Sequence, residues 1–114
     1  MEYLALIYGN ESNWEALSDD DRQALYQRYM DFGTKDEVVG GAELETTSSA
    51  TTVRVQNGDR LVTDGPYAEV KEALGGYYLL ECGSIDEACR LAAEIPAAED
   101  GAIEVRPIYV REES

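Results

Sequence analysis

The segment with the densest chemistry in this sequence spans residues 63–78 and reads TDGPYAEVKEALGGYY. Carboxylates, a phenol and an ammonium group fall close together in it, at Asp64, Tyr67, Glu69, Lys71 and Glu72. A carboxylate beside an ammonium group can serve as base and electrophile when both face one ligand. We therefore predict that Asp64 and Lys71 form a catalytic pair if this segment curls over a cleft.

We expect the residues around this pair to contact the ligand. The predicted contacts are Gly65, Pro66, Tyr67 and Glu69, with Arg106 contributed by a strand near the end of the chain. Glycine lets a ligand approach the backbone closely, and arginine can hold a carboxylate through two hydrogen bonds. Two carboxylates in a loop are a weak signal for a divalent cation, so we predict no metal and no cofactor.

A purely structural interpretation of the same segment competes with the functional one. Asp-Gly-Pro is a turn sequence, because Asp accepts bonds from nearby N–H groups, Gly adopts unusual dihedral angles and Pro fixes φ. A turn alone explains residues 64–66 without any ligand. Lys71 would then form a surface ion pair, and Arg106 would face solvent or pair with an acidic side chain, with little gain in stability.

The chain contains no histidine, which excludes whole classes of mechanism. Triads of Ser-His-Asp or Cys-His type cannot form within one chain, and imidazole ligands for metals are absent. The two cysteines, Cys82 and Cys89, lie seven positions apart without a histidine, which makes a poor zinc site. We expect both to be reduced thiols in the core or half-buried.

The balance of charge restricts the possible partners. There are 24 acidic and 9 basic residues, a formal net charge of −15. Such a field repels nucleic acid and anionic membrane surfaces, so we predict no direct contact with either. The charge keeps the chain soluble or reflects a salt-adapted host; attraction of a basic partner is the alternative. Without a signal peptide, the expected location is cytoplasmic.

The first elements that must position these groups follow from apolar periodicity. A continuous apolar run at residues 3–8 predicts a central strand, and residues 10–17 are expected to form a loop. Ser18 and the three aspartates after it predict the start of a helix that ends near Gly33. The apolar stripe of this helix comprises Leu25, Tyr29 and Phe32.

The middle of the chain reads as strands and a hairpin. Residues 38–45 predict a strand in which Gly40-Gly41 makes a bend or a bulge. Residues 51–56 alternate like a half-buried strand, and Asn57-Gly58 follows them before the second run, residues 61–63, which reads LVT. Asn-Gly between two such runs predicts a tight hairpin, because both turn residues must take positive φ.

The last third predicts a strand, a helix and a strand. Residues 76–82 are apolar, and a capping box at Ser84 begins a helix that stops at Pro96. Residues 103–110 form the final strand, with Pro107 marking an edge or a strand end. The buried stripe of this second helix comprises Ala88, Leu91, Ala92 and Ile95.

The order of these elements predicts the fold. Without the inserted hairpin it is βαββαβ, a ferredoxin-like α+β arrangement. We expect one domain over residues 1–114, with residues 111–114 as a disordered tail. Two helices would cover one face of the antiparallel sheet and leave an apolar face open. A second copy is the simplest cover for that face, so we predict a homodimer.

The sequence resembles the YCII-related proteins over nearly the whole chain, and three segments carry the resemblance. They read MEYLALIYG, LVTDGPYAEVKEALGGYYLLE and IPAAEDGAIEVRPI, and the second resembles the DGPFAETKE motif of the DGPF subgroup. Tyr67 stands where that motif has Phe, and Val70 replaces a Thr, which removes a hydroxyl. The resemblance implies a dimeric α+β barrel and no settled activity. A His–Asp pair proposed for some relatives cannot operate in a chain without histidine.

Two hypotheses for function follow. The first is a homodimer with a small-molecule-binding cleft near the Asp64–Lys71 loop, acting either as an enzyme or as a binding protein. The second is a non-enzymatic regulatory or interaction protein. The resemblance implies a link to extracytoplasmic-function sigma factors for this second hypothesis.

Overall fold

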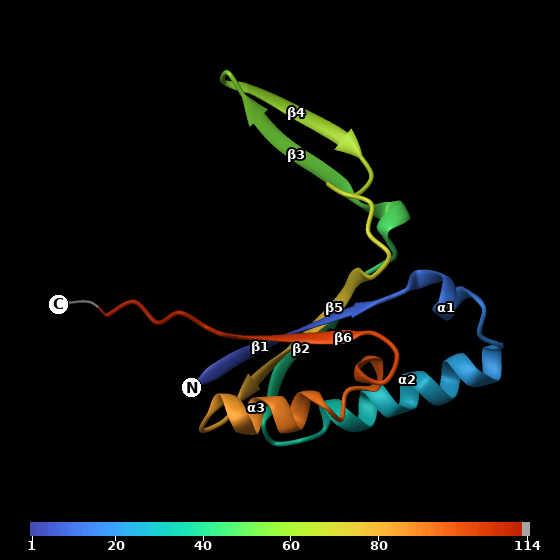
Figure 1. Ribbon diagram of the computed structural model, residues 1–114, viewed down its shortest axis with the longest axis vertical. Helices are drawn as coiled ribbons and strands as arrows, with labels where there is room; N and C mark the ends of the chain where they lie inside the picture. The colour runs from blue at the N-terminus through green and yellow to red at the C-terminus, as the bar shows by residue number, and fades with distance from the viewer. Residues whose placement is uncertain (113–114) are drawn as a thin grey trace.

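The computed structural model describes residues 1–112 and builds them into one open sheet, one separate hairpin and short helices (Figure 1). The elements in chain order are β1 (Glu2–Gly9), α1 (Glu11–Glu15), α2 (Asp19–Gly33), β2 (Val38–Glu43), the 3-10 turn η1 (Thr47–Ser49), β3 (Thr51–Gln56), β4 (Asp59–Asp64), β5 (Ala73–Glu81), α3 (Ile85–Ala92), the 3-10 turn η2 (Pro96–Ala98) and β6 (Ala102–Pro107).

The main sheet has the strand order β2-β5-β1-β6, with every pair antiparallel. Helices α2 and α3 lie on one side of it (Figure 1). Strands β3 and β4 form a two-stranded sheet of their own. The expected ferredoxin-like βαββαβ arrangement with an inserted hairpin is therefore confirmed.

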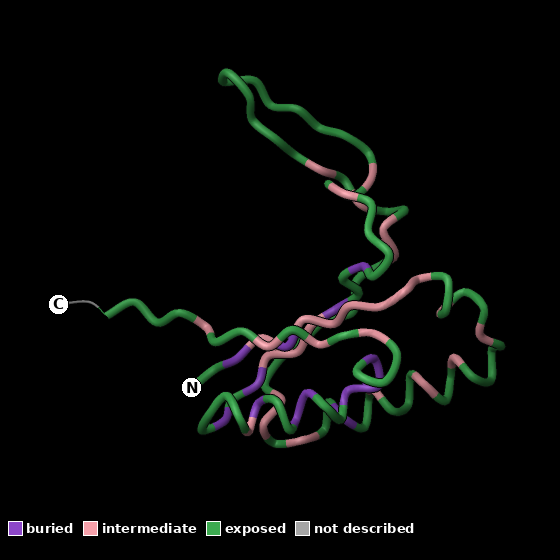
Figure 2. The backbone as a smooth tube through the Cα atoms, in the orientation of Figure 1, coloured by how far each residue is buried: buried purple, intermediate pink, exposed green. Residues whose placement is uncertain are grey.

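The core lies between the main sheet and the two helices, where the buried residues gather in Figure 2. Tyr3 and Ala5 of β1 point toward the helices, and Tyr78 and Leu80 of β5 lie directly opposite them in the register. The predicted stripe of α3 is buried as expected, and Phe32 of α2 is buried against the ring of Tyr78. Alternation along each strand leaves the next residue facing away from the helices.

A glycine pair in β2 allows this strand to approach β5. The register shifts between Val38 and Gly40, which confirms the predicted irregularity. A Cβ atom on Gly41 would lie 2.7 Å from the carbonyl oxygen of Tyr77 and 2.9 Å from Cδ1 of Tyr78. Only a residue without a side chain fits there while Tyr78 keeps its place in the core.

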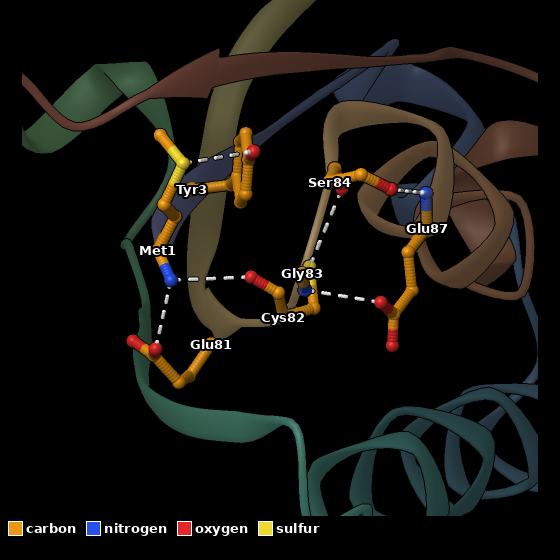
Figure 3. A network of polar contacts seen from close by, with 7 residues as sticks. All are labelled: Met1, Tyr3, Glu81, Cys82, Gly83, Ser84 and Glu87. Atoms are coloured by element: carbon orange, nitrogen blue, oxygen red, sulfur yellow. Dashed lines mark hydrogen bonds and ion pairs between the residues drawn. The ribbon is translucent and has the colours of Figure 1, made fainter.

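The two predicted helix caps are present. The Ser18 hydroxyl accepts a bond from the N–H of Asp21 at 3.1 Å, and the Ser84 hydroxyl accepts one from the N–H of Glu87 at 3.2 Å. The Glu87 carboxylate accepts from the N–H of Gly83 rather than from that of the capping residue (Figure 3). The same view shows the amino group of Met1 donating to Glu81 and to the Cys82 carbonyl, which ties the N-terminus to the end of β5.

Three sequence-based expectations need correction. Residues 10–17 were expected to be a loop, but Glu11–Glu15 form α1, because the Asn10 side chain accepts a bond from the N–H of Ser12 and caps a short helix. Strand β6 ends at Pro107 instead of 110, close to the point where its partner β1 begins at Glu2; the N–H of Ile108 still donates to the Glu2 carbonyl. Cys89 is exposed rather than half-buried.

One further difference concerns β5. It begins at Ala73 rather than at residue 76, because Gly9 and Tyr8 of β1 pair with Ala73 and Leu74 beyond a register shift. Of the predicted tail at 111–114, residues 111 and 112 carry no helix or strand, and residues 113 and 114 lie outside the described residues. Among the residues described, no helix is both long and apolar enough to cross a membrane.

Strands β3 and β4 make a hairpin that we call the arm (residues 51–64). Its turn has φ of 50° at Asn57 and 82° at Gly58, which confirms the predicted hairpin turn. The base is closed by a bond from the N–H of Gly65 to the Ala50 carbonyl and one from the Thr52 hydroxyl to the Gly65 carbonyl, both 2.7 Å long. Beyond that base the arm stands apart from the main sheet (Figure 1).

Candidate functional site

The predicted catalytic segment lies between the arm and β5. Asp64 is the last residue of β4, Gly65 has a φ of 102°, and residues 65–72 form no helix or strand. Asp64, Tyr67 and Lys71 are all exposed. Among residues 1–112, neither Asp64 nor Lys71 forms an ion pair within 4.0 Å.

Arg106 lies elsewhere from that segment. It pairs with Leu4 of β1, on the face of the sheet that points away from the helices. Its Nε atom is 3.9 Å from the carboxylate of Glu104, and both side chains are exposed. This contact agrees with the alternative considered for Arg106, a surface pair of little energetic weight. The structure does not bring Arg106 together with the segment 64–71.

A cavity of about 710 Å³ opens on the helix side of the sheet. Helices α1 and α2 form one wall, the ends of β1, β2 and β5 form the floor, and the residues from η2 to 100 close one side. The aromatic side chains on the helix side of its lining belong to Trp14, Tyr26, Tyr29 and Tyr78. Tyr77 also belongs to the lining, but its side chain points away from the helices. This volume falls in the range of known small-molecule sites, which are mostly apolar hollows with a few polar groups.

The second half of the segment 63–78 lines this cavity. Ala73, Gly75, Gly76 and the two following tyrosines all contribute to it, whereas residues 64–71 do not. A Cβ atom on Gly76 would lie 2.8 Å from the Ala42 carbonyl oxygen, so glycine lets β2 and β5 approach each other at the floor. The loop that carries Asp64 and Lys71 therefore leads directly to the cavity without forming part of its wall.

Tyr78 is the best-anchored side chain in the cavity. Its hydroxyl donates to the carbonyl oxygen of Tyr29 at 3.0 Å, and its ring centroid lies 4.8 Å from that of Phe32. Burial raises the pKa of Tyr78, and the nearby Glu43 carboxylate adds to this effect. The phenol therefore stays protonated at neutral pH and cannot act as a general base there.

The other two phenols on the helix wall are neutral for related reasons. The pKa of Tyr26 is raised by the Glu43 carboxylate beside it, and the pKa of Tyr29 is raised mainly by burial. Of these uncharged phenols, those of Tyr26 and Tyr78 lie near Glu43, and that of Tyr29 lies near Asp100. Such groups can bind a ligand by ring contact and by hydrogen bonds, but they supply no nucleophile at neutral pH.

The charged lining of the cavity is strongly negative. It holds one guanidinium, Arg28, against six carboxylates: Glu11, Asp21, Glu43, Glu45, Glu99 and Asp100. Arg28 is paired with Glu99 at 2.9 Å, and this contact raises the pKa of Arg28 and lowers that of Glu99. Most of the remaining carboxylates therefore face the cavity or its rim without a cation, and the site disfavours anionic ligands.

Two contacts hold α1 in place as the wall of the cavity. The guanidinium of Arg22 donates to the carbonyl oxygens of Trp14 and Glu15 and lies 5.5 Å from the centre of the Trp14 ring. The Glu11 carboxylate accepts bonds from the N–H and hydroxyl of Thr47, at 2.8 and 2.9 Å. Glu11 thereby joins α1 to the turn that leads into the arm.

The remaining reactive groups do not add to this site. The Cys82 thiol donates to the Ser84 carbonyl at 3.7 Å, and burial raises its pKa, so it stays protonated. Within residues 1–112, no cluster of three or more Cys, Asp or Glu side chains is arranged to hold a metal ion. Sequence reasoning missed Trp14, Tyr26 and Glu43, because no local pattern indicates that three separate elements converge on one cavity.

The fold and the comparisons with known proteins define the class of this chain. A four-stranded antiparallel sheet with two helices on one face places it among ferredoxin-like α+β proteins. The model of the YCII-related domain matches residues 1–112. An uncharacterized protein of Rhizobium meliloti (strain 1021) is 38% identical over 117 residues, which cover 95% of this chain and 92% of that protein. The chain belongs to the YCII-related family.

Proposed function

We propose that this YCII-related chain binds a small organic molecule in the cavity between α1, α2 and the sheet. The observation that carries the proposal is the combination of a hollow of about 710 Å³ with a wall of uncharged aromatic rings. Rings give a large contact area at little cost in conformational entropy, and the phenol hydroxyls orient a bound molecule.

The charge of the lining selects the class of ligand. Six carboxylates against one paired guanidinium favour a neutral or cationic molecule over an anion. Glu43 is the carboxylate beside Tyr26 and Tyr78, and it contributes to the raised pKa of both phenols. We infer that a ligand amine would approach Glu43 while its apolar part lies against the rings, a contact that adds a cation–π component.

The predicted pair Asp64 and Lys71 enters this proposal at the rim of the cavity. Lys71 is two residues before Ala73, which is the first residue of β5 and lines the cavity. We propose that a ligand longer than the cavity reaches the loop and meets Asp64 and Lys71, together with the predicted contacts Gly65, Pro66, Tyr67 and Glu69. Whether this contact is catalytic decides between an enzyme and a binding protein.

We also propose that the chain acts as a homodimer. Leu4 and Leu6 of β1 and Tyr77 and Leu79 of β5 alternate with the core residues and point away from the helices. These side chains form the face that we call the open face of the sheet. A second copy would remove their apolar surface from water. The second hypothesis, a regulatory protein linked to a sigma factor, stays a prediction.

The experiment uses the single tryptophan, Trp14, as a reporter inside the cavity. Three compounds of similar size are titrated while its fluorescence is followed: phenethylamine, 2-phenylethanol and 3-phenylpropionate. We expect the amine to bind best and the carboxylate worst, with roughly a tenfold difference in Kd between them. The amine gains an ion pair with a carboxylate of the lining, whereas the ligand carboxylate is repelled by it.

Matched variants locate the binding. Glu43→Gln should abolish the preference for the amine, whereas Glu104→Gln, on the open face, should leave it unchanged. Asp64→Asn and Lys71→Met test the rim with longer amines. A preference for the carboxylate, or binding that ignores Glu43, would contradict the proposed site.

A further inference from the structure

One side of the arm carries three valines that are largely exposed in the described part of the chain. In its register Val53 lies opposite Val62, and Val55, two residues further along the same side, lies opposite Arg60. These three side chains are 57–70% exposed. The opposite side carries Leu61 among polar neighbours such as Arg54 and Thr63. Figure 2 shows the arm exposed along almost its whole length.

A hairpin of this kind does not support itself. Two strands without a third strand or a covering helix are marginally stable at best in water. Two hydrogen bonds close the base of the arm, from Gly65 to Ala50 and from Thr52 to Gly65. Within residues 1–112, no hydrogen bond joins residues 53–63 to the main sheet. A well-formed arm therefore calls for another surface against which Val53, Val55 and Val62 can pack.

The dimensions of the chain also indicate that another surface covers part of it. Its radius of gyration is 16.4 Å, whereas a compact domain of this length has about 13 Å. Its accessible surface is 8354 Å², against about 6,200 Å² for a typical monomer of 12.6 kDa. The excess of roughly 2,000 Å² lies within the range that one subunit of an obligate homodimer buries, about 1,000–2,500 Å². The arm and residues 108–112 are the segments that project in Figure 1.

The position and charge of the arm indicate which molecule covers it. Figure 1 shows the arm rising on the side of the sheet opposite α2 and α3, which is the side of the open face. Arg54 and Arg60 balance Asp59 and Asp64, so the arm is neutral in a chain of net charge −15. Two such chains repel each other everywhere except where neutral surfaces meet.

We propose that each arm clasps a second copy of this chain, with the side formed by Val53, Val55 and Val62 packed against that copy. This inference rests on the proposed homodimer and extends it: the open faces meet, and each arm reaches past its own sheet onto the partner. Because the contact is isologous, it occurs twice in every dimer.

Hydrogen exchange and sedimentation test the clasp on the full chain. We expect a dimer whose arm amides are protected at high protein concentration and lose their protection on dilution, since a free hairpin opens readily. Arm amides that exchange freely in the dimer would overturn the proposal. Protection that does not depend on concentration would also overturn it, because the arm would then pack on its own chain. A chain that stays monomeric at high micromolar concentration would also overturn the proposal.

Two adjacent residues on opposite sides of the arm provide a matched pair. Val62→Asp should raise the Kd of the dimer at least about a hundredfold, because each dimer loses the contact twice. Leu61→Asp should change it by less than about threefold, since an exposed substitution has little effect. Equal effects of the two variants would refute the assigned side.

Trp14 fluorescence with phenethylamine separates the clasp from the proposed ligand site. The cavity lies within one chain, so loss of ligand binding in a clasped dimer would refute the ligand proposal alone. Ligand binding by a chain that never dimerises would refute the clasp alone.

Discussion

Replacing Gly41 by alanine should destabilise the protein through a clash that the structure locates. The new Cβ atom would lie 2.7 Å from the Tyr77 carbonyl oxygen and 2.9 Å from Cδ1 of Tyr78. Neither neighbour can yield easily: the first is backbone in a paired strand, and Tyr78 is held by its bond to Tyr29 and by the Phe32 ring. Overpacking of this kind costs about 1–3 kcal/mol.

The neighbouring glycine is the control for this prediction. A Cβ atom on Gly40 would meet Leu79 at 3.6 Å, an ordinary contact. Gly40→Ala should therefore leave stability unchanged or raise it by up to about 1 kcal/mol, because alanine has less freedom to lose on folding. Gly41→Ala should lower Tm by roughly 4–12 °C for a chain of this length.

Urea titrations of both variants, followed by Trp14 fluorescence and by far-ultraviolet circular dichroism, give the two free energies of unfolding. Gly41→Ala should also weaken ligand binding, since Tyr78 lines the cavity. Equal stability of the two variants would refute the reasoning, because it would mean that Tyr78 is free to move away from β2.

Two further predictions concern ionisable groups. The pKa of Tyr78 is raised in the folded chain, so its contribution to stability is complete below its usual value of 10.0 and is lost as the pH rises through the folded pKa. Thermal scans between pH 8 and 11 should therefore show a steeper loss of stability for the wild type than for Tyr78→Phe. The substitution itself costs about 1 kcal/mol at neutral pH, because the hydrogen bond of the hydroxyl is lost. Parallel curves of stability against pH would contradict this prediction. Exposed Cys89 should react with a thiol reagent in the native protein, while buried Cys82, with its raised pKa, should react only on unfolding. Simultaneous reaction of both thiols would contradict the burial of Cys82 in the core.

Much of the fold could be predicted from local patterns. Apolar runs, the caps at Ser18 and Ser84 and the Asn57-Gly58 turn act over a few residues, so their effects are visible in the sequence. The boundaries of β5 and β6 were less accessible, because a strand ends where its partner ends. Helix α1 was missed since its cap, Asn10, follows directly on a strand and the helix is only five residues long.

The segment 63–78 shows most clearly what each level of structure decides. The sequence alone determines which chemical groups the segment carries and excludes imidazole chemistry. It also carries the resemblance to the YCII-related family. Only the tertiary structure divides the segment: residues 64–71 are outside the cavity, on the end of β4 and the loop after it, whereas residues 73 and 75–78 line the cavity. That division depends on β1, β2 and α2, whose contacts with the segment are distant in the chain. Spacing along a sequence determines which groups a segment carries, whereas packing against remote elements determines which groups share a site.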